Sequence, residues 1–527
     1  MKPLLALLVA LTILPHAPAQ NHPNIVLIVA DDLGYADLAF LPQAPADVEK
    51  FGTPGFDRLA ATGTYFHNAY GASPICSPSR AGLITGRYQQ RWGNYWYGEG
   101  GLPQDELTIP EALAAAGYTT AKFGKTHLNG GPKEFPTRHG FDQFLGFMHH
   151  TWDYIRLSGR DVAAYKSRPS FKSFGNAQVL GPLLKASSRG TTRENATATS
   201  FEDGFTTRIF TDEAVRFIRG EKQDKPFYLH IAHNAVHMPT YIVEPSWAKK
   251  VGARHVPWDR DAPRWGFPYW EPEEEPNKVF HQKWGHMGEI DTDGRRCYLA
   301  NLLALDHSVT RVLDALEETG KRDNTLVVFV SDNGGTINTY ANNTPLRGWK
   351  YMFGEGGIRI PFLISMPGTL PQGAADQSAI VSTMDIFPTI AELARVPVPD
   401  NLDGKSLLPL LRGERSTHHE TLAWAKSRDE WVIRHGRWKL TNNVPWYHRD
   451  FKILPNGDAV DAGQDFTYPG EPQLFDLEND ISESTNLITQ HPDIATRLRS
   501  LYNQWDGQMA GPMTNKGKPK KPKRKKQ

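Results

Sequence analysis

Two uninterrupted apolar runs, each ending in acidic or amide side chains, constrain the fold of this chain more than any other feature. They are NIVLIVADD at residues 24–32 and TLVVFVSDNGG at residues 325–335. Short β-rich runs without polar alternation are typical of central strands that are buried on both faces of a mostly parallel sheet. The sequence therefore predicts a sheet with these two strands in its interior.

Further strand and helix patterns alternate along the chain. PFYLHIAHNAVHMP (226–239) and IPFLISMPG (360–368) are predicted as additional strands. Helical patterns occupy residues 108–118, 300–319 and 383–394. Such alternation predicts an α/β fold, in which a mostly parallel central sheet is flanked by helices on both faces.

Polar side chains follow the two interior strands directly, and they are Asp31, Asp32, Asp332 and Asn333. In open α/β sheets, ligands bind beyond the carboxyl ends of the strands. Three carboxylates brought together there would repel one another without a cation, and oxygen-only ligation is what Ca²⁺ or Mg²⁺ prefers. Acidic and amide residues beside glycine are also common turn residues. From these residues alone, a metal site and a pair of capped turns both stay open.

The first 19 residues have the pattern of a secretory signal peptide. Lys2 is followed by an apolar stretch from Leu4 to Leu14, and Ala17-Pro18-Ala19 supplies small residues for cleavage. The apolar stretch is too short for a bilayer span, and no later stretch is long enough. We expect an exported protein, periplasmic or extracellular, without a membrane span.

The charge balance argues against nucleic acid as a partner. The formal net charge of the 527 residues is +1, so there is no general basic field. Basic residues gather only near the end, where KGKPKKPKRKKQ begins at Lys516. Residues 511–527 are therefore predicted to form a disordered basic tail, which either solubilises the chain or attaches it to an anionic surface.

The chain has only two cysteines, Cys76 and Cys297. In an exported protein the default expectation is a disulfide between them. Cys297 opens an amphipathic helical pattern, however, where a free thiol can pack in the core. Cys76 lies in SPICSPSRAGLITG (73–86), where Pro78 suits the first turn of a helix. Cys76 would then lie near a helix N-terminus, which favours anions, with Arg80 one turn on. A nucleophile beside an arginine and a divalent metal suits sulfate or phosphate.

Seven segments of this sequence resemble the formylglycine-dependent sulfatases of the alkaline-phosphatase-like superfamily, and they occur in the family's order. The signature segment is Cys76-Ser77-Pro78-Ser79-Arg80, continued by AGLITG. The others are NIVLIVADDLGYAD (24–37), GKTH (124–127), VHMP (236–239), SDNGG (331–335), LRGWKYMFGEGGIRIP (346–361) and LFDLENDISESTNL (474–487). GKTH departs from the family's Gly-Lys-x-His at Thr126, where Trp is common. The resemblance runs from about residue 23 to 490.

The resemblance implies a fate for Cys76. In this family the cysteine is oxidised to Cα-formylglycine by a formylglycine-generating or other sulfatase-maturing enzyme, and the hydrated aldehyde is a geminal diol. One diol oxygen attacks sulfur, and the other later loses its proton, so that sulfate leaves and the aldehyde returns. A serine could form the sulfate ester but could not release it in this way.

The resemblance also implies roles for other residues. Ca²⁺ is expected to be held by Asp31, Asp32, Asp332 and Asn333, with Cys76, as formylglycine, completing the shell. Sulfate oxygens are expected to be neutralised by Arg80, Lys125 and Lys350. His237 is expected to protonate the leaving oxygen, and His127 to orient the diol and accept its proton.

The domain organisation follows from both lines of argument. We expect a signal peptide at 1–19, a catalytic domain at 22–414 and a smaller α+β domain at 415–510. In the last region, alternation such as Trp431, Ile433 predicts half-buried antiparallel strands, and ATRLRSLYNQWDGQM could supply a helix. The family carries a small antiparallel sheet with a helix in that place.

The substrate is predicted to be a sulfated carbohydrate, because aromatic and polar loops occur among the motifs. FMHHTWDYIR (147–156) offers His149, His150 and Arg156 as substrate contacts. The loop at 257–285 offers Trp265 and Trp270 for stacking on sugar rings, although it could also pack on its own domain. Simple aryl sulfates are expected to serve as test substrates.

Two other functions compete with a carbohydrate sulfatase. The first is a phosphodiesterase or phosphonate monoester hydrolase, since relatives use the formylglycine motif on phosphorus. The second is a non-catalytic, Ca²⁺-dependent glycan-binding protein in which Cys76 stays unmodified. The full set of cationic and histidine residues argues against the second, because a lectin has no need of it.

Overall fold

The structure is a computed structural model, and it describes most of the chain outside four long gaps and some short ones. The described residues are 22–97, 99–148, 183–199, 201, 204–221, 225–238, 240, 243–253, 292–397, 399–467 and 470–513. The predicted signal peptide therefore lies outside them, as do the predicted substrate residues His149, His150, Arg156, Trp265 and Trp270. No helix within the described part is long and apolar enough to cross a membrane.

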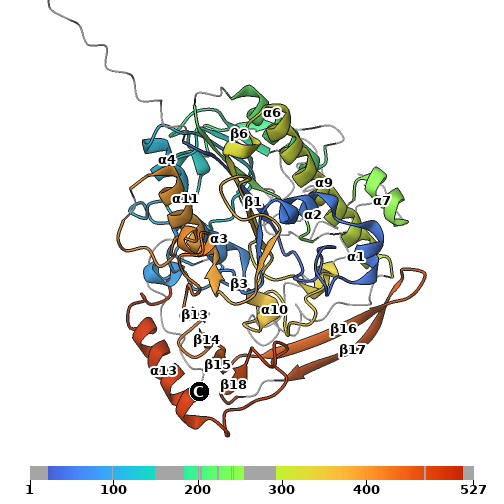
Figure 1. Cartoon of the computed structure of the whole chain (residues 1–527), viewed down its shortest axis with the longest axis vertical. Helices are drawn as coiled ribbons and strands as arrows, with labels where there is room; N and C mark the ends of the chain where they lie inside the picture. Colours follow the sequence, from blue (N-terminus) through green and yellow to red (C-terminus); the bar gives the residue numbers. More distant parts are fainter. Residues whose placement is uncertain are drawn as a thin grey trace, which may run out of the picture.

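A large sheet forms the centre of the molecule (Figure 1). Within the described residues it has ten strands, in the order β11-β2-β10-β9-β1-β8-β4-β5-β6-β7. Their bounds are β1 Asn24–Ala30, β2 Thr64–Phe66, β4 Thr119–Lys125, β5 Gln143–Phe147, β6 Leu183–Ala186, β7 Thr197–Thr199, β8 Phe227–Ala232, β9 Thr325–Ser331, β10 Phe362–Ser365 and β11 Ala374–Asp376. The four predicted strand segments are thus β1, β9, β8 and β10, and β1 and β9 lie side by side in its interior.

The fold class is as predicted, and the central sheet is mixed, with parallel pairing in its middle. Its five middle strands, β9-β1-β8-β4-β5, are parallel, whereas β10 runs antiparallel to β9, and β6 and β7 form antiparallel pairs beyond β5. A parallel neighbour needs a crossover, usually a helix. Between β9 and β10 the chain has only a 3₁₀ turn (Ile337–Thr339), the short helix α10 (Glu355–Ile358) and irregular segments, so it re-enters beside β9 and runs back.

Helices cover both faces of the sheet, as the sequence predicts (Figure 1). Alternate side chains of β1 point into two different cores: Val26 and Ile28 into one, Ile25 and Leu27 into the other. The first core is completed by α2 (Pro54–Ala61), α6 (Thr206–Gly220), α7 (Pro245–Val251) and α9 (Gly294–Glu318). The second is completed by α3 (Cys76–Thr85), α4 (Ile109–Ala115), α11 (Ile386–Ala394) and α12 (Leu408–Leu411).

Three of these helices correspond to predicted segments, with shifted bounds. The predicted 108–118 helix is α4, whose Thr108 and Glu111 form a reciprocal capping box. The predicted 383–394 helix begins as a 3₁₀ turn, Thr383–Asp385, before α11. The predicted 300–319 helix is α9, which begins at Gly294, so Cys297 lies in its first turn. The remaining described helix of the N-terminal part, α1, spans Ala46–Phe51.

A smaller antiparallel sheet follows in the C-terminal part of the chain. Its strand order is β13-β14-β15-β18, with bounds Thr421–Ala425, Trp431–His435, Trp438–Asn442 and Gln473–Asp476. The predicted helix is α13 (Pro492–Asp506), which packs on the sheet through Tyr502, stacked 3.8 Å from the ring of Trp431. A separate ribbon, β16 (Trp446–Ile453) with β17 (Ala459–Thr467), and a short pair, β3 (Ala69–Tyr70) with β12 (Val381–Ser382), complete the strands described.

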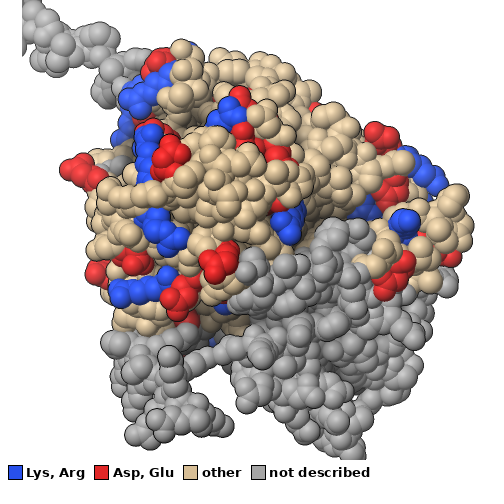
Figure 2. All heavy atoms as spheres, turned by 90° about the horizontal axis from the view of Figure 1, so that it is seen from below, with Lys and Arg blue, Asp and Glu red and all other residues tan. Residues whose placement is uncertain are grey.

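The surface carries both signs of charge. Figure 2 shows acidic and basic side chains interspersed over the described part of one face, in keeping with the net charge of +1. Residues 511–513 of the predicted basic tail belong to the described part of the chain, and Met513 donates its backbone N–H to Gly93 O at 2.9 Å. Residues 514–527 lie outside the described part of the chain.

The two cysteines are not joined, so the disulfide alternative is wrong in this structure. Both thiols are free and buried. Cys76 Sγ lies 3.5 Å from Asp31 Oδ1, whereas Cys297 Sγ lies 3.7 Å from Asp293 Oδ2. The first belongs to the carboxyl edge of the sheet and the second to the start of α9.

We therefore expect the stability of the protein to be independent of reductant. The melting temperature of the protein should be the same with and without dithiothreitol. Alkylation in denaturant without reductant should label Cys297 in every molecule, as measured by peptide mass spectrometry. A Cys297 peptide that becomes reactive only after reduction would contradict the structure.

Candidate active site

The acidic cluster forms because β1 and β9 are parallel neighbours in register. Ala30 pairs with Ser331, so the residues that follow each strand leave the sheet side by side. Asp32 N donates to Asp332 Oδ1 at 3.3 Å, and Asn333 Nδ2 donates to Asp32 Oδ1 at 2.8 Å. Asp31, Asp32, Asp332 and Asn333 are all fully buried. Three carboxylates and an amide thus meet at the carboxyl edge of the sheet.

Cys76 and Arg80 reach this cluster from α3. Ile75 is extended and Cys76 is the first helical residue, so the thiol lies at the helix N-terminus as predicted. Cys76 Sγ lies 3.5 Å from Asp31 Oδ1, and the side chain is 1% exposed. One turn on, Arg80 Nε donates to Asp332 Oδ2 at 2.8 Å. Arg80 Nη2 also lies 3.7 Å from Asp31 Oδ1, so both residues face Asp31.

Two lysines complete the ring of charge. Lys125, the last residue of β4, donates from Nζ to Asp31 Oδ2 at 2.5 Å. Lys350, from the segment between β9 and β10, donates to Asp32 Oδ2 at 2.8 Å and lies 2.7 Å from its Oδ1. Both side chains are buried. Each of the three carboxylates therefore has a different cationic partner, which reduces the cost of burying it.

The two predicted histidines lie in the same region. His237 Nδ1 donates to Met238 O at 2.8 Å, which leaves Nε2 facing the cluster, 3.6 Å from Asp32 Oδ2. His127 follows β4 by two residues, is buried, and adopts a positive φ of 50°. Its backbone N–H donates to Met148 O at 2.9 Å. Nine of the ten predicted catalytic and metal residues are thus linked by contacts within the described part of the chain, and the tenth, His127, lies two residues after Lys125.

The electrostatics differ from residue to residue. Burial raises the pKa of Asp32, and it raises the pKa of Asp332 to about 6. Burial acts on Asp31 too, but Lys125, His237 and Arg80 together hold its pKa well below the usual range. Burial raises the pKa of the Cys76 thiol, despite the nearby lysines. A thiol in this state is a poor nucleophile, because the thiolate is the reactive form.

The residues present suit a hard divalent cation. The carboxylates of Asp31, Asp32 and Asp332 offer anionic oxygens, and the side-chain amide oxygen of Asn333, Oδ1, is buried without a hydrogen-bond partner. A buried polar atom left without a partner is costly unless something else satisfies it. An oxygen-rich donor set of this kind is typical of Ca²⁺ rather than Zn²⁺.

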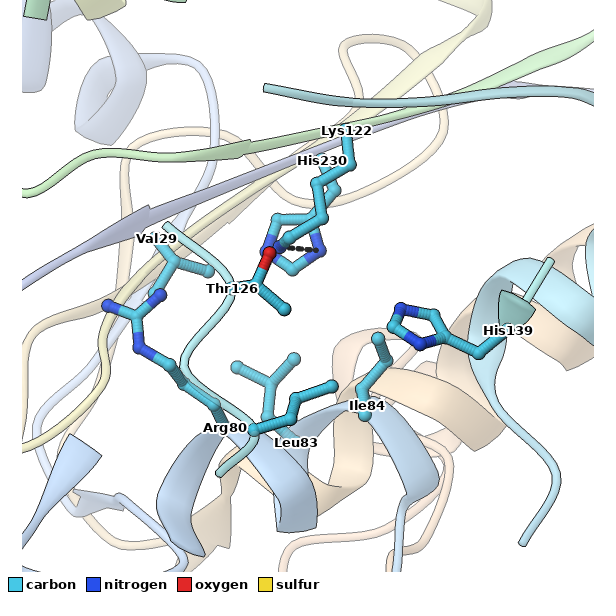
Figure 3. Close-up of a pocket in the computed structure, with 9 residues that line it drawn as sticks. Val29, Arg80, Leu83, Ile84, Lys122, Thr126, His139 and His230 are labelled. Carbon is cyan, nitrogen blue, oxygen red and sulfur yellow. Dashed lines mark hydrogen bonds between the residues drawn. The ribbon is translucent and has the colours of Figure 1, made fainter. Parts of the chain in front are cut away.

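A small cavity lies on the other side of Arg80 (Figure 3). The cavity has room for about one water molecule. Lys122 Nζ lies 3.4 Å from both ring nitrogens of His230, and the Thr126 hydroxyl points toward this pair. Burial lowers the pKa of both Lys122 and His230 well below the ordinary values. Thr126 is smaller than the Trp common in that position, and its side chain lines the cavity.

Ser79 was not predicted as a site residue, yet its hydroxyl donates to the backbone oxygen of Asp332 at 2.5 Å. This bond connects α3 to the loop after β9. Ser79 lies directly before Arg80 in the signature segment, so its position in that segment could have identified it. Lys122 and His230 were not predicted either, because lone polar residues inside strand patterns belong to no motif.

Known proteins are similar to this chain over most of its length. The sulfatase family model matches residues 23–396. Human arylsulfatase A is 30% identical over 504 residues, covering 91% of this chain and 87% of its own. N-acetylgalactosamine-6-sulfatase of Canis lupus familiaris is 27% identical over 518 residues, covering 93% and 86%. The crystal structure of Ps i-CgsB in complex with k-i-k-neocarrahexaose is 28% identical with a TM-score of 0.70, covering 93% of this chain and 94% of that one.

Replacing Asp332 by Ala should weaken Ca²⁺ binding. The substitution removes one carboxylate from the donor set, and changes even in residues around metal ligands typically lower affinity about 10- to 100-fold. Titration calorimetry of the chelator-treated protein should show at least a ~10-fold loss. Asp323→Ala, at an exposed position just before β9, is the matched control and should bind Ca²⁺ as the native protein does. Equal Ca²⁺ affinity in both variants would mean that Asp332 only caps a turn.

Proposed function

This chain belongs to the sulfatase family of sulfuric ester hydrolases, and on that premise we propose that it is an exported sulfatase that removes sulfate from a carbohydrate, using Cys76 as formylglycine. The observation that carries the proposal is the arrangement around Cys76. Three carboxylates and three cationic side chains gather around the buried side chain of Cys76, at the N-terminus of α3. Membership of an enzyme family also removes support for the non-catalytic glycan-binding alternative.

The protonated thiol supports a modified nucleophile. Burial holds the proton on Cys76 Sγ, so the unmodified residue has little thiolate with which to attack. As formylglycine, hydrated to a geminal diol, it would attack sulfur through one oxygen while the ester oxygen leaves. Loss of the proton from the second hydroxyl then breaks the carbon–oxygen bond to the sulfated oxygen, so sulfate leaves and the aldehyde returns.

The cationic side chains would bind and orient the sulfate group. Arg80, Lys125 and Lys350 approach the cluster from α3, β4 and the segment before β10, so a tetrahedral anion placed beside Cys76 meets positive charge from three directions. Groups fixed in advance around developing negative charge are among the largest contributions to catalysis. When bound, Ca²⁺ would add polarisation of the sulfate oxygens, held by Asp31, Asp32, Asp332 and Asn333.

His237 is assigned as the general acid for the leaving oxygen. Its Nδ1 is held by Met238 O, so Nε2 faces the site. Burial and the Lys350 charge lower the pKa of His237, whereas the negative charge of a bound sulfate ester acts in the opposite direction. We therefore expect His237 to be protonated when the sulfate ester is bound. His127 is assigned to orienting the diol and accepting its proton.

A sulfated carbohydrate is supported as the substrate class by the relatives. One of them is named N-acetylgalactosamine-6-sulfatase, and one solved structure is a complex with k-i-k-neocarrahexaose. The predicted sugar contacts His149, His150, Arg156, Trp265 and Trp270 remain predictions. The alternative activity on phosphate or phosphonate esters is tested by comparing kcat/KM on an aryl sulfate with kcat/KM on the matching aryl phosphate.

Maturation should be visible in the mass of one peptide. When the protein is produced with a formylglycine-generating enzyme, residue 76 should exchange two hydrogens and a sulfur for one oxygen. Across preparations that differ in this fraction, kcat should rise in proportion to it. Mass spectrometry of the peptide and aryl sulfate turnover provide the two measurements. Full turnover by protein with only unmodified Cys76 would overturn the mechanism.

His237→Ala should damage turnover most when the leaving group is poor. A sugar alkoxide needs a proton far more than a nitrophenolate does, and general acid assistance is typically worth about 10²- to 10⁴-fold. The ratio of kcat on a sulfated oligosaccharide to kcat on nitrophenyl sulfate should therefore fall by at least ~10²-fold. Equal losses on both substrates would remove the acid role from His237.

A further inference from the structure

A buried glutamate of the C-terminal part of the chain holds the segment that carries Lys350. Glu483 lies in LFDLENDISESTNL, a segment to which the chemistry above assigns no role. Its side chain is fully buried. Glu483 Oε2 accepts the backbone N–H of Glu355 at 2.7 Å, and Glu483 O accepts from Arg347 Nη1 at 2.8 Å. One residue thus binds both ends of the stretch 347–355, with Lys350 between them.

That stretch is a closed turn with few ways to move independently. Gly356 N donates to Arg347 O at 2.8 Å, which closes the turn on itself. Lys350 N donates to Gly335 O at 3.0 Å, and Tyr351 N donates to Pro74 O at 2.7 Å. The turn therefore contacts the loop after β9, which carries Asp332 and Asn333, and also the residues just before Cys76.

The C-terminal sheet anchors Glu483 in turn through a buried lysine. Lys439 Nζ of β15 lies 2.7 Å from Glu483 Oε1 and 2.9 Å from Glu355 Oε1, and its side chain is fully buried. Burial acts against the ionisation of both glutamates. Lys439, Arg359 and Arg434 nevertheless lower the pKa of Glu355 to about 2, whereas the pKa of Glu483 is raised to about 7.

An ionic cluster of this kind is a costly way to stabilise a fold. Desolvating buried charges costs several kcal/mol per ion, and apolar replacements of a buried ion pair are often neutral or stabilising. The cluster does fix a geometry: Glu483 Oε2 accepts the Glu355 N–H, and Glu483 Oε1 lies in an ion pair with the Lys439 ammonium, so the turn and the C-terminal sheet are held in one relative position. The atom most affected is Lys350 Nζ, which must reach Asp32.

We propose that Glu483 is a positioning residue for the sulfatase reaction: it fixes the turn 347–356 against the C-terminal sheet and so places the Lys350 ammonium at the sulfate site. The proposal rests on the role assigned to Lys350 in the proposed function. Glu483 touches no reacting atom, so it acts only through the turn. Misplacing a catalytic group by about 1 Å can cost ~10²-fold in rate.

A double-mutant cycle tests the proposal on the matured, full-length enzyme. The variants are E483A, K350A and the pair, assayed by kcat and KM on an aryl sulfate, whose good leaving group keeps the residual turnover measurable. E483A should lower kcat about 10²-fold with KM changed less than about threefold. In the K350A background the same change should cost less than about threefold, because residues that act through one another are not additive. E478Q, an exposed position on the same segment, is the matched control and should keep native kcat.

The conservative variant E483Q covers the case in which E483A does not fold. Its amide oxygen can still accept from Glu355 N–H, but its NH₂ group faces Lys439, so a smaller loss of kcat, about tenfold, is expected, again only when Lys350 is present. Hydrogen exchange of the 347–356 peptide should quicken in E483Q and not in E478Q. Equal fold-losses in both backgrounds, or native kcat with native exchange, would overturn the proposal. Native kcat in K350A alone would instead overturn the role of Lys350 in the proposed function.

Discussion

The burial of three carboxylates at one edge of the sheet is the constraint on which the rest of the structure depends. Asp31, Asp32 and Asp332 are fully buried, and the backbone N–H of Asp32 donates to the Asp332 carboxylate. Without compensation, such a cluster would cost far more than a typical domain has in net stability. The fold meets this cost by bringing one cation from each of three elements: Arg80 from α3, Lys125 from β4 and Lys350 from the turn before β10.

Close backbone approach is what makes this convergence geometrically feasible. A Cβ on Gly334 would lie 1.9 Å from Gly356 O, so only glycine lets the loop after β9 touch the Lys350 turn. Gly124, just before Lys125, has a φ of +113°, and a Cβ there would lie 1.9 Å from Ala232 O. Each of two lysines in the site therefore depends on a glycine that permits contact between backbones. Substituting either glycine would move a charged group away from its carboxylate.

Much of this could be predicted from the sequence, and the failures have physical causes. The apolar runs predicted β1 and β9, and the strand-end rule predicted that Asp31 and Asp332 would meet. The resemblance located Cys76, Lys125 and Lys350. The direction of β10 was not predicted, because hydrophobicity marks a strand but not the return path of the chain. The Glu483–Lys439–Glu355 cluster was not predicted either, since its residues are 44 and 84 positions from Lys439 and no local pattern relates them.

The C-terminal sheet is therefore better understood as part of the catalytic unit than as an appended module. Its apolar residues share a core with Tyr70, Phe353 and Ile358, which belong to the segments that carry Cys76 and Lys350. Trp424 Nε1 donates to Gly71 O at 2.8 Å, five residues before Cys76, and Lys439 reaches the Lys350 turn through Glu355. Cys76 and Lys350, two of the residues proposed to act on sulfate, are thus supported from the same side. Any substitution that shifts this sheet therefore displaces both residues at once. A substitution in the C-terminal sheet can thus lower the catalytic rate, although it lies far from Cys76 in the sequence.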